Sequence, residues 1–203
     1  MWARPASFIS HPSSLFIGTR IPALPYDHVI GESLPYAIAV LCYLFDEQGR
    51  VLLLRRRKCP NRDLYSPVGG KLEQSTGESP TACAVREIGE ETGLELSPAD
   101  LHLTGIVSER GYEDRMHWLM FLYETLGPVD VPPGPVEEGL LEWHHPAALD
   151  SLPIPETDRK IIWPMFWKYR NKFFVMHIDC GGDIMNWRIE QPPMDADRGG
   201  DGR

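Results

Sequence analysis

The strongest local pattern in the chain lies in the stretch Gly69–Leu94, GGKLEQSTGESPTACAVREIGEETGL. It places Glu87, Glu90 and Glu91 at positions i, i+3 and i+4. A helix turns by about 100° per residue, so the three carboxylates share one side of the segment if it is helical. Like charges at these spacings repel each other, and their concentration therefore needs a compensating positive partner. A divalent cation is the natural candidate.

The ends of this helix are marked by residues with strong positional preferences. Ser79 is a good N-cap, Pro80 suits the first helical position, and Gly93 suits the position after the last helical residue. We therefore predict a helix over residues 80–92. Its expected packing side consists of Ala84, Val85, Ile88 and Thr92. The glycines at 69 and 70 let the preceding loop approach closely, so a backbone carbonyl can join the carboxylates around a metal ion.

Apolar runs on both sides of this segment predict strands and one further helix. Residues 36–45, YAIAVLCYLF, and the run VLLLRRR at 51–57 are expected to pair as a hairpin around a turn at 46–50. A second helix is expected to open at Pro155, with Pro164 kinking or shortening it. The remaining expected strands are 101–109, 116–124, 140–144, 172–179 and 183–190. The last two are expected to form a closing hairpin. Residues 127–135 are too rich in Pro and Gly for regular structure.

Composition places the chain among ordinary globular proteins. Its 203 residues, of which 42% are apolar and 24% charged, suit one domain with a sizeable core. A net charge of −9 argues against stable binding to nucleic acid or to an anionic membrane surface. The four cysteines show neither C-x-x-C spacing nor nearby histidines at zinc spacing, and no apolar run approaches the length of a membrane span. We expect a cytoplasmic protein with reduced thiols.

Two terminal regions differ from the predicted central domain. Residues 1–35 contain five prolines and no sustained period, which favours an N-terminal extension that packs on the domain, packs on a second subunit or stays loose. A homodimer is therefore left open. The domain is expected to span residues 36–190, followed by a disordered tail over 191–203.

The opening stretch resembles the Nudix box, whose pattern is G-x5-E-x7-R-E-U-x-E-E-x-G-U with U aliphatic. Glu78 and the run Arg86–Leu94, REIGEETGL, match this pattern fully. The departure lies before Glu78, where the loop GGKLE at residues 69–73 carries two extra residues, most simply Ser75 and Thr76. The resemblance extends over roughly residues 35–190 and implies an α/β/α sandwich with a mixed central sheet.

The same resemblance implies roles for residues of the box. Glu87, Glu90 and Glu91 would bind Mg²⁺ or Mn²⁺, joined by the carbonyl of Gly70 and with Glu73 as a further ligand to consider. Arg86 would pair with Glu78 and hold the loop against the helix. Metal ions clustered by carboxylates can neutralise phosphate oxygens and generate hydroxide. The predicted catalytic residues are thus Arg86, Glu90, Glu91 and Glu138. Glu138, or its neighbour Glu137, would act as a base from a loop before the last strand of the sheet.

Substrate-binding residues are predicted on both sides of the box. The basic run at 55–58 is either a solvated strand end or a phosphate-contacting segment, which makes Arg57 a candidate together with Lys71 of the loop. The C-terminal third resembles the oxidised-purine nucleoside triphosphatases of the family, in which acids at the start of the last helix bind the base. Glu156 and Asp158 match that region, although acids there also serve as ordinary helix caps.

Other features of that subfamily are replaced in this chain. Ser66 stands where an asparagine is typical, and Pro155 follows Ile154 where a stacking tryptophan is expected. Glu109 occupies the place of a proline that ADP-ribose hydrolases often have, and Tyr112 is similar to a tyrosine of dinucleoside polyphosphate hydrolases. The resemblance therefore implies Mg²⁺-dependent hydrolysis of a purine nucleoside triphosphate to monophosphate and pyrophosphate. ADP-ribose or dinucleoside polyphosphate hydrolysis, or nucleotide sensing without catalysis, remain alternatives.

Overall fold

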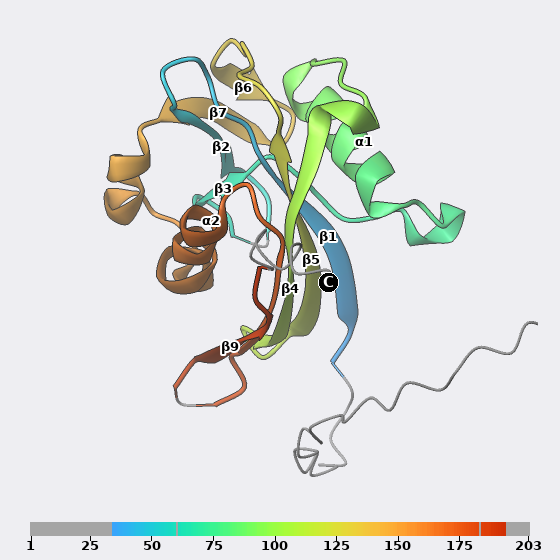
Figure 1. The fold of residues 1–203 in the computed structure, drawn as a ribbon, viewed down its shortest axis with the longest axis vertical. Coiled ribbons are helices and arrows are strands. Elements are labelled where there is room, and N and C mark those ends of the chain that lie inside the picture. The colour runs from blue at the N-terminus through green and yellow to red at the C-terminus, as the bar shows by residue number, and fades with distance from the viewer. Residues whose placement is uncertain (1–33, 60, 183, 194–203) are drawn as a thin grey trace, which may run out of the picture. The chain divides into compact units, whose positions relative to one another are not determined.

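The computed structural model describes residues 34–59, 61–182 and 184–193 (Figure 1). The strands are β1 Tyr36–Tyr43, β2 Val51–Arg56, β3 Tyr65–Pro67, β4 Leu101–Tyr112, β5 Met116–Thr125, β6 Gly134–Val136, β7 Gly139–His144, β8 Phe174–Asp179 and β9 Asn186–Gln191. The main helices are α1 Pro80–Thr92 and α2 Trp163–Tyr169, the latter preceded by a π-helical turn, η4 Asp158–Ile162; short 3₁₀ turns are η1 Gln74–Thr76, η2 Pro98–Asp100 and η3 Pro146–Ser151.

These strands form two sheets. The larger has the order β1-β5-β4-β8-β9 and is mixed, because β1 runs parallel to β5 and β4 parallel to β8, whereas β4–β5 and β8–β9 are antiparallel. The smaller, β3-β2-β7-β6, is antiparallel throughout. The predicted strand pair 101–109 and 116–124 and the closing hairpin are thereby confirmed.

The larger sheet is covered on both faces, since β1 sends alternate side chains to two separate hydrophobic clusters. Val40 and Cys42 pack in the cluster that contains Ala84 and Ile88 of α1. Tyr43 packs in the cluster of α2, where its ring stacks on Phe166 with 4.0 Å between centroids. This alternation explains why 36–45 is apolar at successive positions. The predicted α/β/α sandwich with a mixed central sheet is confirmed.

Two predictions about strands need correction. The hairpin of 36–45 with 51–57 survives only at its turn, where Phe45 bridges Val51, because β1 and β2 then enter different sheets. The edge of β1 is instead taken by the loop after β3, through Cys42 N–H to the Val68 carbonyl at 2.7 Å. The Pro- and Gly-rich segment 127–135 also contains the start of a short strand, β6, paired with β7.

The helix predicted over 80–92 is confirmed with its caps. The Ser79 hydroxyl accepts a hydrogen bond from the Ala82 N–H at 3.2 Å, and Gly93 adopts the left-handed conformation at φ 76°. Ala84 and Ile88 of the predicted packing side are buried, whereas Val85 and Thr92 are only partly buried and Cys83 and Glu91 are buried as well. The buried face of α1 is therefore rotated toward the carboxylates, and one of them lies inside.

Pro164 shapes the second helix as expected. A proline has no N–H to donate to the carbonyl four residues earlier, so an α-helical ladder cannot continue through this position. The Trp163 N–H instead bonds the Asp158 carbonyl five residues back, closing the π turn, and Pro164 lies in the first turn of α2. This turn aims Asp158 into the interior, where it is buried.

The predicted extension over residues 1–35 and tail over 191–203 lie almost wholly outside the described residues, and the domain boundaries 36–190 stay a prediction. Among the described residues, no helix is long and apolar enough to cross a membrane.

Candidate active site

The loop before α1 approaches both the sheet and the helix at its two glycines. Gly69 has φ 142°, and a Cβ there would lie 2.3 Å from the Val40 carbonyl oxygen. A Cβ on Gly70 would lie 2.3 Å from Oε1 of Glu87. The Gly70 carbonyl accepts a hydrogen bond from Val40 N–H at 2.9 Å and keeps a second lone pair. Gly69 therefore needs glycine, whereas a side chain at residue 70 would displace the Glu87 carboxylate, which lies close to the Gly70 backbone.

Arg86 joins this loop to the helix. Its Nε and Nη2 donate to the two oxygens of Glu78 at 2.8 and 2.9 Å, in the bidentate geometry that favours a carboxylate. These bonds lower the pKa of Glu78 to about 2. The Nη1 atom donates to Glu87 at 2.8 Å and to Glu90 at 3.1 Å. The predicted Arg86–Glu78 pair is present, and the same guanidinium also supplies positive charge between two metal-ligand candidates.

The two residues inserted in the loop are absorbed without displacing the helix. Residues Gln74–Thr76 form the 3₁₀ turn η1, which Gly77 closes in the left-handed conformation at φ 69°. The ends of the turn are tied together because the Glu73 N–H donates to Glu78 Oε2 at 2.8 Å. Glu78 thus keeps its place opposite Arg86 despite the longer loop.

The three helix carboxylates occupy different environments. The Glu90 side chain is 60% exposed, whereas Glu91 is 5% exposed and Glu87 is mostly buried. Burial raises the pKa of Glu91 to about 8 and also raises that of Glu87. One Glu91 oxygen accepts the Gly69 N–H at 3.1 Å, and the other has no partner among the described residues. A carboxylate oxygen without another partner is available as a ligand for a hard divalent cation.

The carboxylate oxygens of the box are the kind of ligand that Mg²⁺ and Mn²⁺ prefer. In this structure the side chains contact other protein groups. Across the described residues, no three Asp, Glu, His or Cys side chains are already gathered around one metal position. Glu87 and Glu90 converge on Arg86 instead. The carboxylates therefore have the right chemistry for a divalent cation, and Arg86 balances part of their charge.

A cavity of about 490 Å³ extends from α1 across the sheet. Its lining includes Gly70, Lys71, Arg86 and Glu87 from the box, together with Glu138 from the segment between β6 and β7. Of the predicted site residues, those that line this cavity are Gly70, Lys71, Arg86, Glu87, Glu138 and Asp158. Glu91 lies beneath the lining through its bond to Gly69, and Glu90 projects from the exposed side of α1.

The basic run at the end of β2 contributes different residues from the one predicted. Arg56 and Lys58 line the cavity, whereas Arg57 is exposed outside it. Side chains on an extended chain alternate in direction, so these neighbours of Arg57 share the opposite side. Arg56 and Lys58 lie 3.8 and 4.0 Å from oxygens of Glu138, and they place positive charge beside that carboxylate. Arg57 is thus exposed and not part of this lining, and its predicted contact with substrate phosphates stays a prediction.

The far end of the cavity is apolar with a few polar groups. Leu41, Pro67, Trp118, Met120 and Pro155 supply the apolar lining. The Lys71 ammonium lies over the Trp118 ring, 5.3 Å from its centroid. Ser66 lies in this lining, is nearly buried, and has a hydroxyl without a hydrogen-bond partner among the described residues. Tyr112 also lines the cavity and donates its hydroxyl hydrogen to Asn61 Oδ1 at 2.6 Å.

The two acids predicted to bind the base are separated by the structure. Asp158 is buried and lines the cavity, whereas Glu156 is largely exposed and pairs with Lys160. Residues two apart on a helix point in nearly opposite directions, which explains the separation. Burial, followed by the charge of Glu109, raises the pKa of Asp158 to about 7. Glu156 is thus not part of this lining, and its predicted contact with the base stays a prediction.

Glu109 is a buried acid whose role the sequence did not suggest. It is 3% exposed, and its burial raises its pKa to about 7 although Thr157 and Cys180 hydrogen-bond to it. The burial of Glu109 could have been predicted from the alternation of side chains along a strand. Gly105, Val107, Glu109 and Gly111 are the inward positions of β4. Glu109 is therefore a buried acid whose charge adds to the raised pKa of Asp158.

The fold and the box helix define a class of protein, and comparison with known proteins shows the same class. A family model described as the NUDIX domain matches residues 35–163. The chain therefore belongs to the NUDIX domain family, and it is a hydrolase of the pyrophosphate bond in nucleotide-linked compounds.

Among individual relatives, the uncharacterized Nudix hydrolase YvcI of Bacillus subtilis is 31% identical over 115 residues, covering 56% of this chain and 69% of that protein. The solved structure of a mutator MutT protein from Bacillus halodurans is 25% identical, with a TM-score of 0.57 over 77% of this chain and 99% of that one. The NUDIX domain of Shewanella oneidensis NrtR, solved in complex with ADP ribose, shares the fold at 16% identity, with a TM-score of 0.54 over 70% and 93% of the two chains.

Proposed function

We propose that this chain hydrolyses a purine nucleoside triphosphate to the monophosphate and pyrophosphate, using Mg²⁺ or Mn²⁺. The observation that carries the proposal is one cavity that runs from the carboxylates of α1 to the buried acid Asp158. A phosphate chain needs the charged end, and a heterocyclic base suits an apolar end with a few polar groups. The two ends therefore match the two parts of a nucleotide.

At the phosphate end, the chain supplies metal ligands, a base and cations. The ligands are Glu87, Glu90, Glu91 and the Gly70 carbonyl. A metal ion bound there neutralises charge on phosphate oxygens and lowers the pKa of a bound water. Glu138 lines the same cavity as Glu87, which supports a role for it as the base that takes a proton from the attacking water. Lys71, Arg56 and Lys58 contribute positive charge along the path of the phosphates.

At the base end, Asp158 and Ser66 provide hydrogen bonds within apolar walls. With its pKa raised to about 7, Asp158 is protonated in part of the molecules near neutral pH, so it can donate to a purine carbonyl or accept from a ring N–H. The Ser66 hydroxyl has no other described partner and is available to the same ligand. Trp118 and Met120 offer surfaces against which a flat ring can pack.

The test is hydrolysis of a nucleotide panel with Mg²⁺, including ATP, GTP and their oxidised forms, together with ADP-ribose and a dinucleoside tetraphosphate. Asp158→Asn should raise KM for the preferred purine substrate by about tenfold while kcat changes less, because the residue contacts the base rather than the phosphate. Glu156→Gln is the matched control, since this neighbouring acid lies outside the cavity. Equal effects of the two substitutions would contradict the assignment of the base end.

The same panel separates the alternatives. Preferred turnover of ADP-ribose or of the dinucleoside tetraphosphate would move the assignment to those substrates, and Tyr112 in the lining gives the latter a structural basis. Binding without products would identify a sensor. The retention of all box carboxylates favours the enzyme. The cytoplasmic location, the absence of nucleic-acid binding and the homodimer stay predictions.

A further inference from the structure

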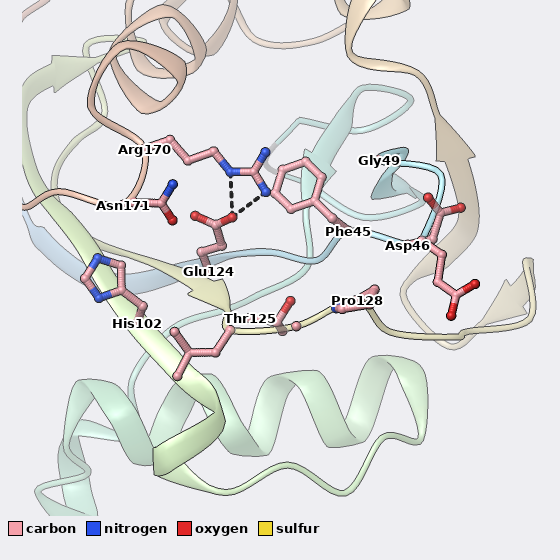
Figure 2. A pocket seen from close by; sticks show the side chains of 12 residues that line it. Phe45, Asp46, Gly49, His102, Glu124, Thr125, Pro128, Arg170 and Asn171 are labelled. Atoms are coloured by element: carbon pink, nitrogen blue, oxygen red, sulfur yellow. Dashed lines mark hydrogen bonds and ion pairs between the residues drawn. The ribbon is translucent and has the colours of Figure 1, made fainter.

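A second cavity, of about 590 Å³, lies at the other end of the β4–β5 pair from the active site (Figure 2). It is built where four parts of the chain meet: the turn after β1, the start of β4, the end of β5 and the link between α2 and β8. It shares no lining residue with the catalytic cavity. The proposed catalytic mechanism uses none of its side chains.

Glu124 lies in the lining with one carboxylate oxygen unused. It is 6% exposed, and Figure 2 shows its carboxylate beneath the guanidinium of Arg170. The Nε and Nη2 atoms of Arg170 both contact Oε1, at 2.6 and 2.5 Å. A two-oxygen fork would satisfy the whole carboxylate. Here Oε2 is buried without a hydrogen-bond partner among the described residues, which is an unfavourable state for an ionised group.

His102 provides a second unused polar atom next to the first. It is the direct partner of Glu124 in the β4–β5 register, so their side chains leave the sheet on the same face. The His102 Nε2 atom is also buried without a partner among the described residues. An acceptor oxygen of Glu124 and a nitrogen of His102 that can donate thus both belong to this lining, on the same face of the sheet, and both are unused.

The charges around these atoms indicate which ligand class fits. Arg170 balances Glu124, and the nearby Asp46 is paired with Arg50 at 2.6 Å. An anion would meet the Glu124 carboxylate, and a metal ion would meet the Arg170 guanidinium. A neutral ligand avoids both conflicts. The Arg170 guanidinium carbon lies 4.1 Å from the centroid of the Phe45 ring, so a shift of Arg170 would expose a flat aromatic face to a planar molecule.

We propose that this cavity binds a small neutral, planar molecule with an amide edge, such as a lactam-type nucleobase. Its N–H donates to Glu124 Oε2, and its carbonyl accepts from Nε2–H of His102. Both protein atoms are buried within the cavity lining, so the partly exposed Arg170 side chain shifts to admit the ligand edge while it keeps its contact with Glu124 Oε1. The site is separate from the proposed catalytic function and does not depend on it.

The test uses uracil as the probe and 1,3-dimethyluracil, which lacks both N–H donors, as its matched analogue. We would follow the His102 imidazole resonances of the full chain by NMR during titration. Uracil should produce saturable shifts with a dissociation constant on the order of millimolar, and the dimethyl analogue should bind about tenfold or more weakly. The comparison on the unmodified chain makes the result independent of any variant's folding.

Glu124→Gln supplies the second arm. Arg170 holds the amide oxygen toward itself, so the NH₂ group takes the Oε2 position and faces the N–H of the ligand. Uracil binding should weaken about tenfold or more, while the exposed Glu95→Gln control leaves it unchanged. Equal responses to the two pyrimidines, an unchanged affinity in Glu124→Gln, or a uracil-soaked crystal with only water between Glu124 and His102 would each overturn the proposal.

Discussion

Replacing Glu91 by glutamine should stabilise the metal-free protein at alkaline pH and remove its response to metal. Burial raises the pKa of this carboxyl to about 8, compared with about 4.3 for an unfolded chain. The protonated form is thus favoured in the folded state. The resulting destabilisation is nearly absent below the unfolded pKa and grows as pH rises from about 4.3 to 8.

The magnitude follows from the same two pKa values. At pH 8 the linkage is at most about 5 kcal/mol, and at pH 5 it is about 1 kcal/mol. Allowing for relaxation around the charge, we expect Glu91→Gln to gain about 3 kcal/mol at pH 8, or about 6–12 °C in Tm for a chain of this size. Glutamine keeps an oxygen for the Gly69 N–H, so the loop contact is retained.

The assay is thermal unfolding of both proteins at pH 5 and pH 8, with and without Mg²⁺. Magnesium should raise the Tm of the wild type at pH 8 and have little effect on the variant, whose Mg²⁺-dependent turnover should be lost. Glu90→Gln is the matched control on the same helix, because its exposed side chain carries little desolvation and should leave the pH dependence unchanged. A Glu91→Gln protein that is destabilised equally at both pH values would refute the reasoning.

Three further predictions concern the loop and helix of the box. Arg86→Lys should reduce kcat/KM by about a hundredfold, because lysine cannot make the bidentate bonds to Glu78; assays with saturating Mg²⁺ check this, and near-wild-type activity would contradict it. Gly70→Ala should lower turnover strongly in a folded protein, since its Cβ overlaps the Glu87 carboxylate; unchanged Mg²⁺ affinity by calorimetry would argue against that contact. Ser79→Ala should reduce the free energy of unfolding by about 1 kcal/mol through loss of the N-cap, measured by urea unfolding.

The parts of this protein that follow from short-range interactions were accessible from the sequence. The limits of α1 were predicted because its caps act within a few residues, and the Arg86–Glu78 pair because both belong to one short motif. Pro164 likewise acts on its own helix. The resemblance then supplied the fold class, which the family match confirmed.

Long-range packing decided the rest. Whether β2 pairs with β1 or with β7 depends on strands that are distant in sequence. The same distant strands decide which residues of the basic run at 55–58 face the cavity. The sequence alone determined that three glutamates share a helix suited to a metal ion. Only the tertiary structure decided that Glu91 is buried and Glu90 exposed, because the depth of a side chain is set by the elements packed around it.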